Sequence, residues 1–225
     1  MLSADLVRRI VLNLVPMVLS LTVHEFAHAY VADRLGDDTP RRQGRLTLSP
    51  MAHYDVFGTL LVPIAAVYFA GFAMIGWARP VEFSPAALSR RFTMRTGAAL
   101  VALAGPLSNL ALAVLSLGAL AATLHFRPDW LVAGAPAVAL LQSMYIINVG
   151  LCIFNLLPLP PLDGSRLLPR SLDDLQQAVA PYSFLLLLAI LYSGTLRHVL
   201  LEVPMQVVAG GLEALFRIRV FGGLS

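Results

Sequence analysis

Long apolar runs separated by short polar segments dominate the pattern of this 225-residue chain. A helix that crosses a bilayer needs about 20 mostly apolar residues in a row. Four runs meet this requirement clearly, at residues 10–31, 97–124, 136–157 and 182–203. Together with two less regular runs, they predict an all-α polytopic membrane protein with about five transmembrane helices, within a range of four to six.

The segment 55–77 is also long enough to cross the bilayer, but Pro63, Gly71 and Gly76 interrupt it. Both of its flanks are rich in arginine, and cytoplasmic loops are enriched in basic residues. We therefore expect this segment to be re-entrant or a helical hairpin, with a plain crossing as the less favoured alternative. The last apolar stretch, 204–217, alternates apolar and polar residues and is expected to lie at the membrane interface.

Two shorter stretches predict non-helical backbone. The sequence GRLTLSPMAHYDVFG (44–58) alternates in character between Gly and Pro punctuation, which predicts a short strand or β-hairpin. The sequence GWARPVEF (76–83) has two interpretations: an extended segment that pairs with a substrate backbone, or an interfacial anchor built on Trp77 and Arg79. Non-helical backbone at membrane depth must pack in protein or line a wet cavity. We therefore expect a small β-hairpin or re-entrant element near a functional site.

The composition supports a membrane protein and excludes a soluble one. Hydrophobic residues make up 58% of the chain and charged residues 13%, whereas about a quarter of a soluble domain is charged. The net charge of +3 comes from arginines in short segments, so it indicates topology, and no nucleic-acid partner is expected. No repeat or long linker is visible, which predicts a single domain over 1–225. The arginine-bearing segments expected on the cytoplasmic side are 32–54, 78–96 and 158–180, with 125–135 outside.

Three ionisable residues lie within the first apolar run, in the sequence LTVHEFAHAY. His24 and His28 are four residues apart, so a helix places them on one face, and Glu25 follows the first histidine. In the H-E-x-x-H pattern two imidazoles bind zinc and the glutamate handles the proton of a water molecule. Ionisable groups inside a membrane helix are costly and by default mark function. The alternative, in which the histidines only form hydrogen bonds between helices, leaves that cost without a compensating ion.

A catalytic zinc ion usually takes a third protein ligand, and the sequence NLLPLPPLDGSRLL (155–168) offers one. Asp163 follows a proline-rich stretch at the end of an apolar run, and Gly164 gives the backbone freedom to turn. Two interpretations stay open on the residues alone: Asp163 binds zinc, or Asp163 caps the N-terminus of a short helix that follows it.

Other polar residues in or beside the apolar runs predict packing. Gly105 and Pro106 predict a kink that lets helices approach closely. Asn109 and Asn148 are expected to form hydrogen bonds between helices, with contact of Asn109 with the site as an alternative for that residue. His53 and Asp55 favour a polar turn at the membrane edge over a contact with metal or substrate.

The order of these motifs resembles that of the site-2 protease family of intramembrane zinc metalloproteases. The residues that carry the resemblance are His24-Glu25-x-x-His28, Ala104-Gly105-Pro106-x-x-Asn109 and Asn155-x-x-Pro158-x-Pro160-x-x-Asp163-Gly164. The chain is similar to the short branch of the family, which has no PDZ domain. The resemblance implies one Zn²⁺ per chain bound by His24, His28 and Asp163, with Glu25 as the catalytic acid and base. It also implies contacts of Asn155 and Asn109 with substrate or oxyanion.

The expected function is hydrolysis of peptide bonds within or near transmembrane segments. The resemblance implies that the substrates are single-pass membrane proteins or remnant membrane peptides in the lipid bilayer. We expect a multi-pass protein of the bacterial inner membrane whose active site faces the cytoplasm. A non-catalytic metal-binding scaffold is one alternative, but it would have no use for Glu25. A transporter is another, but its polar residues would be spread along a route through several helices.

Overall fold

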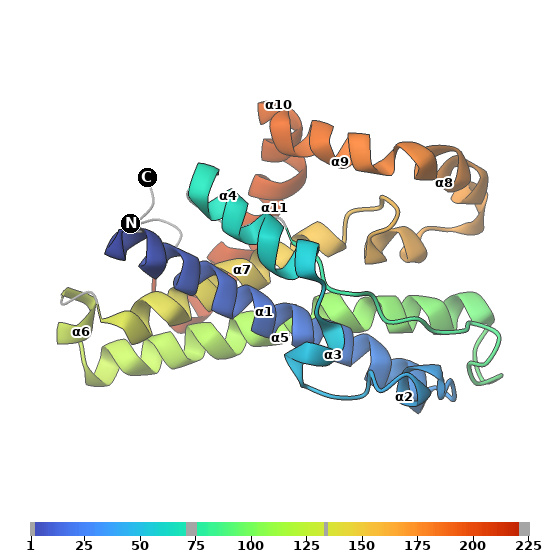
Figure 1. The fold of residues 1–225 in the computed structure, drawn as a ribbon, viewed down its shortest axis with the longest axis horizontal. Helices are drawn as coiled ribbons and strands as arrows, with labels where there is room; N and C mark the ends of the chain where they lie inside the picture. Colours follow the sequence, from blue (N-terminus) through green and yellow to red (C-terminus); the bar gives the residue numbers. More distant parts are fainter. Residues whose placement is uncertain (1–2, 71–75, 133–134, 221–225) are drawn as a thin grey trace.

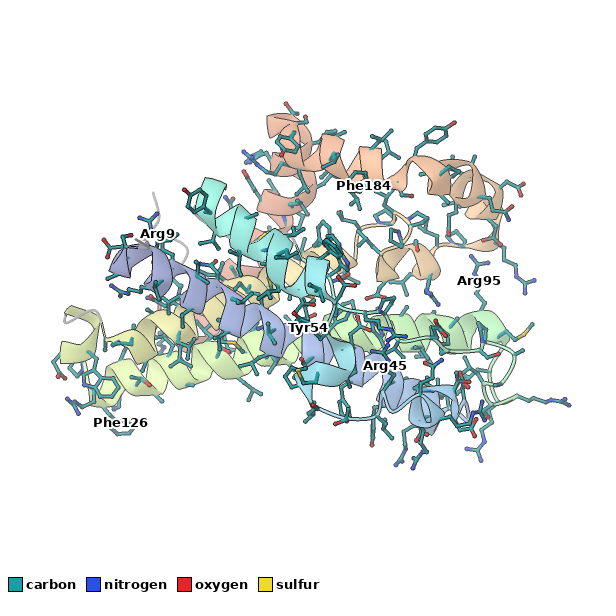
Figure 2. All side chains as sticks on the ribbon, in the orientation of Figure 1. Arg9, Arg45, Tyr54, Arg95, Phe126 and Phe184 are labelled. Atoms are coloured by element: carbon teal, nitrogen blue, oxygen red, sulfur yellow. The ribbon has the colours of Figure 1, made fainter. Side chains whose placement is uncertain are left out.

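Five helical stretches form the membrane-spanning part of the protein. The computed structural model describes residues 3–70, 76–132 and 135–220, and the ribbon is shown in Figure 1. Within these residues, five stretches are long and apolar enough to cross a bilayer: α1 (Ala4–Arg34), α5 (Met94–Phe126), α7 (Pro136–Asn155), Arg170–Tyr192 and Gly194–Phe216. The predicted all-α membrane fold is confirmed. Exposed apolar side chains such as Phe126 and Phe184 cover its outer surface, as expected for a lipid-facing protein (Figure 2).

Helices α1, α5 and α7 pack side by side along their lengths and form the centre of the bundle (Figure 1). The side chain of Ser3 caps α1 by accepting a hydrogen bond from the backbone N–H of Leu6, and α5 is capped in the same way by Thr93. A buried apolar cluster that includes Leu117, Tyr145 and Ala209 joins α5 and α7 to α11 (Val203–Phe216). These contacts fix the helices that carry the polar residues.

The segment 55–77 leaves and returns on the same side of the bundle. Its described part comprises η1 (Val56–Leu61), a π-helix, and α4 (Val62–Ala70); residues 71–75 lie outside the described part. The backbone N–H of Trp77 donates to the carbonyl of Gly58 at 3.1 Å, and the hydroxyl of Thr59 donates to the carbonyl of Trp77 at 2.9 Å. These contacts join the two ends of the segment, as the prediction of a re-entrant segment or helical hairpin requires. Residues 76–84 then form no helix and run alongside α1.

The β-hairpin predicted for 44–58 is wrong for the described residues. This stretch forms α3 (Pro50–His53), a single turn that follows α2 (Thr39–Arg42), and then enters η1. Pro50 stands at the first helical position, where its fixed φ favours a helical turn and its missing N–H has no consequence. Asp55 caps η1 by accepting a hydrogen bond from the N–H of Gly58 at 2.7 Å. Among the described residues, no neighbouring strand is available to stabilise an alternative extended conformation.

The prediction of one helix over 182–203 is also wrong. The helix is interrupted at Ser193. The backbone of this residue is extended (φ −76°, ψ 114°), and its side chain caps the next helix. One stretch consists of η3 (Arg170–Leu172), α8 (Asp173–Val179), η4 (Ala180–Tyr182) and α9 (Ser183–Tyr192). The other consists of α10 (Gly194–Arg197), η5 (His198–Glu202) and α11.

The stretch 204–217 therefore belongs to a helix of the bundle and not to the interface. Met205 and Ala209 are buried in it against α5 and α7. The two remaining short elements are α6 (Asp129–Val132), between α5 and α7, and η2 (Asp163–Leu167), a 3₁₀ helix that follows the proline-rich loop after α7.

Candidate metal centre

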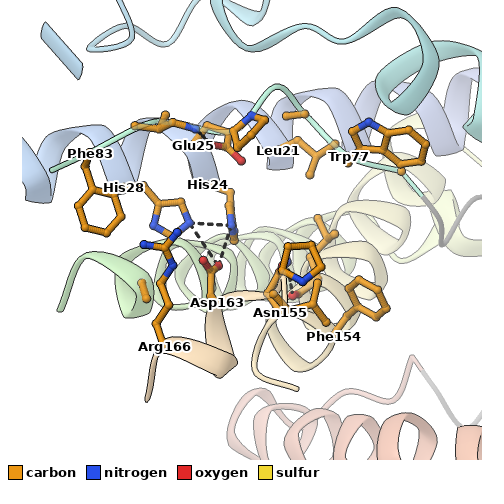
Figure 3. Close-up of a pocket in the computed structure, with 18 residues that line it drawn as sticks. Leu21, His24, Glu25, His28, Trp77, Phe83, Phe154, Asn155, Asp163 and Arg166 are labelled. Carbon is orange, nitrogen blue, oxygen red and sulfur yellow. Dashed lines mark hydrogen bonds and ion pairs between the residues drawn. The ribbon is translucent and has the colours of Figure 1, made fainter. Parts of the chain in front are cut away.

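His24, His28 and Asp163 meet at one point between α1 and η2 (Figure 3). The Nε2 atoms of the two histidines lie 3.0 Å apart. Oδ2 of Asp163 lies 3.1 Å from Nε2 of His24 and 3.2 Å from Nε2 of His28. Tetrahedral zinc with bonds of about 2.0–2.1 Å separates its ligand atoms by about 3.3 Å. The triangle of ligand atoms therefore has nearly the size that a zinc site requires.

The other ring nitrogens show which atoms are free to bind a metal. Nδ1 of His28 lies 2.7 Å from the carbonyl oxygen of Val101, and Nδ1 of His24 lies 2.6 Å from Oδ1 of Asn109. A carbonyl oxygen only accepts hydrogen bonds, so Nδ1 of His28 carries a proton, and in the neutral imidazole its Nε2 then has the lone pair. Such bonds to the second nitrogen are typical of metal-binding histidines.

The three converging atoms could hold a cation. Among the described residues, Oδ2 of Asp163 is buried and has no hydrogen-bond donor, although both imidazoles lie within ion-pair distance. With both imidazoles neutral and protonated on Nδ1, their Nε2 lone pairs and the carboxylate would face each other inside the protein. A divalent ion placed between them would bind all three, so the residues fit zinc.

Gly105 of α5 provides the space for the imidazoles. A Cβ atom at this position would lie 2.5 Å from Nε2 of His24 and would also collide with Nε2 of His28. The close packing predicted for this glycine is thus confirmed, and it occurs directly against the two histidines.

Asp163 owes its position to the sharp turn of the chain around it. A Cβ atom at Gly164 would lie 2.5 Å from the carbonyl oxygen of Leu157, so only glycine allows the loop after α7 to pack this closely. The residue that precedes η2 is Leu162, and no side chain caps that helix. The carboxylate of Asp163 instead turns toward the histidines, so the capping interpretation is wrong.

Glu25 lies on the neighbouring side of α1. Together with the two histidines and Asp163 it lines a cavity. Its Oε2 accepts a 2.9 Å hydrogen bond from the backbone N–H of Val81 in the segment 76–84. The cavity has a volume of about 310 Å³. Its polar lining consists of His24, Glu25, His28, Asn155, Asp163 and Arg166.

The two ends of the cavity differ in character (Figure 3). Phe83 and Arg166 lie at one end, where the guanidinium carbon of Arg166 stands 4.8 Å from the centre of the Phe83 ring. Trp77 and Phe154 lie at the other end. Neither Arg166 nor Phe83 was predicted from the sequence, although Arg166 comes only three residues after Asp163, and that proximity is a signal for it.

The remaining predicted residues take different places. Asn155 lines the cavity, and its Nδ2 donates to the carbonyl of Leu151 at 3.0 Å. Asn109 is fully buried and lies behind His24, outside the lining of the cavity. His53 is buried and bonded through Nε2 to the carbonyl of Thr47 at 2.9 Å, and Asp55 caps η1; neither residue lines the cavity.

The far end of the segment 76–84 is held by a buried carboxylate. Oδ2 of Asp37 accepts a 2.5 Å hydrogen bond from the N–H of Ser84, and Oδ1 accepts from the N–H and hydroxyl of Thr39. Burial by itself opposes ionisation of Asp37, but these hydrogen bonds outweigh it and lower its pKa below the usual value. The segment is thus anchored at Trp77, Val81 and Ser84.

Comparisons with known proteins support the same type of site. Residues 128–193 match the model of peptidase family M50. The chain is 43% identical over 157 residues to "Putative zinc metalloprotease YwhC" of Bacillus subtilis, covering 68% of this chain and 66% of that relative. It is 30% identical over 207 residues to "Putative zinc metalloprotease Rip2" of Mycolicibacterium smegmatis, covering 88% of this chain and 75% of the relative.

A third relative, "Putative zinc metalloprotease Rip2" of Mycobacterium tuberculosis, is 35% identical over 185 residues, which cover 80% of this chain and 66% of the relative. The matched regions thus span two thirds to three quarters of the lengths of these relatives. No solved structure matches the chain.

Proposed function

Because this chain belongs to the site-2 protease family of intramembrane zinc metalloproteases, peptidase family M50, we propose that His24, His28 and Asp163 bind its zinc ion and that Glu25 is its catalytic acid and base. The observation that carries this proposal is the triangle of three potential ligand atoms, 3.0–3.2 Å apart, in a cavity that is also lined by the carboxylate of Glu25.

Zinc in such a site acts as a Lewis acid on a carbonyl group and lowers the pKa of a water molecule toward about 7. Glu25 has the position of the proton carrier, because it lines the cavity without belonging to the ligand triangle. Its carboxylate takes a proton from the attacking water and returns it to the leaving amine. The hydrogen bond from Val81 orients the carboxylate, and Asn155 offers its amide to the substrate.

The segment 76–84 is the proposed support for the substrate backbone. In an extended chain, alternate residues direct their backbone groups to opposite edges. The N–H groups of Trp77, Arg79 and Val81 all bond to the protein, through Gly58, His53 and Glu25 respectively. Between them, Ala78 directs its N–H and carbonyl to the other edge and Pro80 its carbonyl alone, and there an unwound substrate segment pairs by strand addition.

The contact of Arg166 with Phe83 joins the two walls of the cavity at one end. An exposed cation–π contact contributes only about 0.5–1 kcal/mol. It therefore opens at little cost, and a peptide can enter the cavity between η2 and the segment 76–84. The proposed substrates are single-pass membrane proteins or remnant membrane peptides.

The active site faces the cytoplasm of a bacterial cell in this proposal. The arginine-bearing loops at the His28 end of α1 and at the start of α5 lie together, since the N–H of Ser89 donates to the carbonyl of Leu35 at 2.6 Å. Basic residues of membrane proteins accumulate on the cytoplasmic side. The relatives described above are bacterial proteins, which supports the bacterial inner membrane as the location.

A cleavage assay in lipid vesicles tests the proposed function. The purified protein is incorporated with a model single-pass substrate, and the wild type is compared with Glu25→Gln. The matched control is Glu82→Gln, because Glu82 is exposed on the same segment that contacts Glu25 but does not line the cavity. Cleavage by the wild type and the control, with loss in Glu25→Gln, supports the proposal; equal cleavage by all three proteins overturns the role of Glu25.

A further inference from the structure

Three buried side chains form a hydrogen-bonded chain behind His24. They come from three different helices: Asn109 from α5, Asn148 from α7 and Ser20 from α1, and all three are fully buried. Oδ1 of Asn109 lies 2.6 Å from Nδ1 of His24. Nδ2 of Asn109 donates to Oδ1 of Asn148 at 2.9 Å, and Nδ2 of Asn148 donates to Oγ of Ser20 at 2.8 Å. The side of His24 that points away from the cavity is thus connected to a polar network inside the bundle.

The donor and acceptor roles in this series of hydrogen bonds are fixed by the groups at its far end. The hydroxyl of Ser20 donates to the carbonyl of Pro16 at 2.6 Å, and Nδ2 of Asn148 also donates to the carbonyl of Met144 at 2.8 Å. Both end groups are backbone carbonyls, which can only accept hydrogen bonds. The NH₂ group of Asn148 must therefore face Ser20 and Met144, and its oxygen must face Asn109.

The same reasoning fixes the donor and acceptor roles of Asn109 and His24. Because the oxygen of Asn148 only accepts, Asn109 must present its NH₂ group to Asn148 and its oxygen to the imidazole. The oxygen of Asn109 in turn requires a proton on Nδ1 of His24. A neutral imidazole with its proton on Nδ1 has a lone pair on Nε2, the atom that faces His28 and Asp163.

We propose that Asn148 and Ser20 are positioning residues that hold His24, through Asn109, in the tautomer that binds zinc. This inference rests on the proposed function of His24 as a ligand. It also predicts a difference between the two histidines. The tautomer of His28 is fixed directly by the backbone carbonyl of Val101, whereas that of His24 depends on side chains that substitution can remove.

A purely structural role makes a different prediction. Asparagines between membrane helices also serve as interhelical hydrogen bonds, which contribute to stability alone. Such a role would lower the thermal stability of a variant and leave its affinity for zinc unchanged. The proposal instead expects a loss of zinc affinity, because partners of metal-binding histidines typically change that affinity 10- to 100-fold.

The test measures zinc affinity by competition with a chromophoric chelator, and the visible spectrum of the Co²⁺-loaded protein, in the wild type and Asn148→Leu. Tyr145→Phe is the matched control, because Tyr145 is equally buried on the same helix and its hydroxyl donates to Ala209, away from His24. The expected result is zinc binding weaker by roughly 10- to 100-fold in Asn148→Leu and within about twofold of the wild type in the control. Equal affinities in all three proteins would overturn the proposal.

Two further variants keep the outcome decisive. Ser20→Ala removes only a hydroxyl, so it replaces Asn148→Leu in the test if that variant does not fold. A several-fold loss of zinc affinity supports the proposal, and an unchanged affinity contradicts it.

His24→Ala separates the positioning role from the proposed metal site. If His24→Ala also keeps full zinc affinity, the proposed metal site itself has failed. If it loses zinc while Ser20→Ala and Asn148→Leu do not, only the role of the chain behind His24 has failed.

Discussion

The backbone N–H of Val81 donates a 2.9 Å hydrogen bond to Oε2 of Glu25, although the two residues are 56 positions apart. This bond joins the segment 76–84 to the helix that carries both histidines. It occupies one oxygen of the carboxylate and leaves the other for chemistry. The segment that supports the substrate backbone in our proposal therefore also positions the catalytic group.

Removal of this N–H should slow cleavage without loss of metal. In Val81→Pro the donor is absent, and the extended backbone after Pro80 is compatible with a second proline. A hydrogen bond to a charged group contributes about 1.5–3 kcal/mol, so we expect cleavage to slow by roughly 10- to 100-fold. Val81→Ala keeps the N–H and serves as the control. Zinc content and initial cleavage rates of both variants provide the measurement, and equal rates would contradict the positioning role.

The space beside the imidazoles should not tolerate a methyl group. A Cβ atom at Gly105 would lie 2.5 Å from Nε2 of His24, so Gly105→Ala should displace the histidine and abolish tight zinc binding. Gly118→Ala on the same helix is the control, because its nearest neighbour would be Cε1 of Phe216 at 3.1 Å, an atom at the end of a side chain. Both changes favour the helix by up to about 1 kcal/mol. A loss of zinc binding that is confined to Gly105→Ala would therefore come from the contact with the histidines and not from a weaker helix. Zinc retained at full stoichiometry in Gly105→Ala would contradict this geometry.

Asp37 should make the stability of the protein depend on acid pH. Its pKa in the folded protein is below the usual value, because the hydrogen bonds of Thr39 and Ser84 outweigh the effect of burial. Such a carboxyl contributes stability that is complete above the unfolded pKa of about 3.9 and is lost as the pH falls through the folded value. We expect the wild type to melt at a higher temperature than Asp37→Asn at pH 6, with a gap that narrows below about pH 4. The comparison uses zinc-free protein in detergent; a constant gap would refute this assignment.

The re-entrant course of 55–77 can be tested by labelling from one side of the membrane. In a Cys152→Ala background, single cysteines replace Gln43, Arg90 or Pro128, which are all exposed. A membrane-impermeant maleimide added to intact cells should label the Pro128 variant and leave the other two unlabelled until the membrane is opened. Labelling of Gln43 and Arg90 from opposite sides would contradict the re-entrant course, and labelling of both in intact cells would reverse the proposed orientation.

The sequence allowed the prediction of those parts of the site that local spacing determines. His24 and His28 share a helical face because they are four residues apart, and the structure places Asp163 against both. The pairing with Asp163 required the family resemblance, since no periodicity relates positions 24 and 163. The hydrogen bond between Glu25 and Val81 was outside the reach of the sequence for the same reason.

Hydropathy could not locate the ends of adjacent apolar helices. Ser193 and Gly194 lie within a nearly continuous apolar run, so a window average joined α9 to the helix that follows. Ser193 ends one helix and caps the next through a local hydrogen bond that such an average does not contain. In the same way, Asn148 was expected to bond between helices, but its connection to His24 depends on how three helices pack.

Zinc titration tests the central claim most directly. Metal-free wild-type protein in detergent is titrated with Zn²⁺ beside Asp163→Asn, Glu25→Gln and the control Asp129→Asn, whose exposed carboxylate pairs with Arg127 at the start of α6. The account predicts one tightly bound zinc ion in the wild type, in Glu25→Gln and in the control, and its loss in Asp163→Asn. Tight binding of one zinc ion by Asp163→Asn, or its loss in Glu25→Gln alone, would contradict the ligand set proposed here.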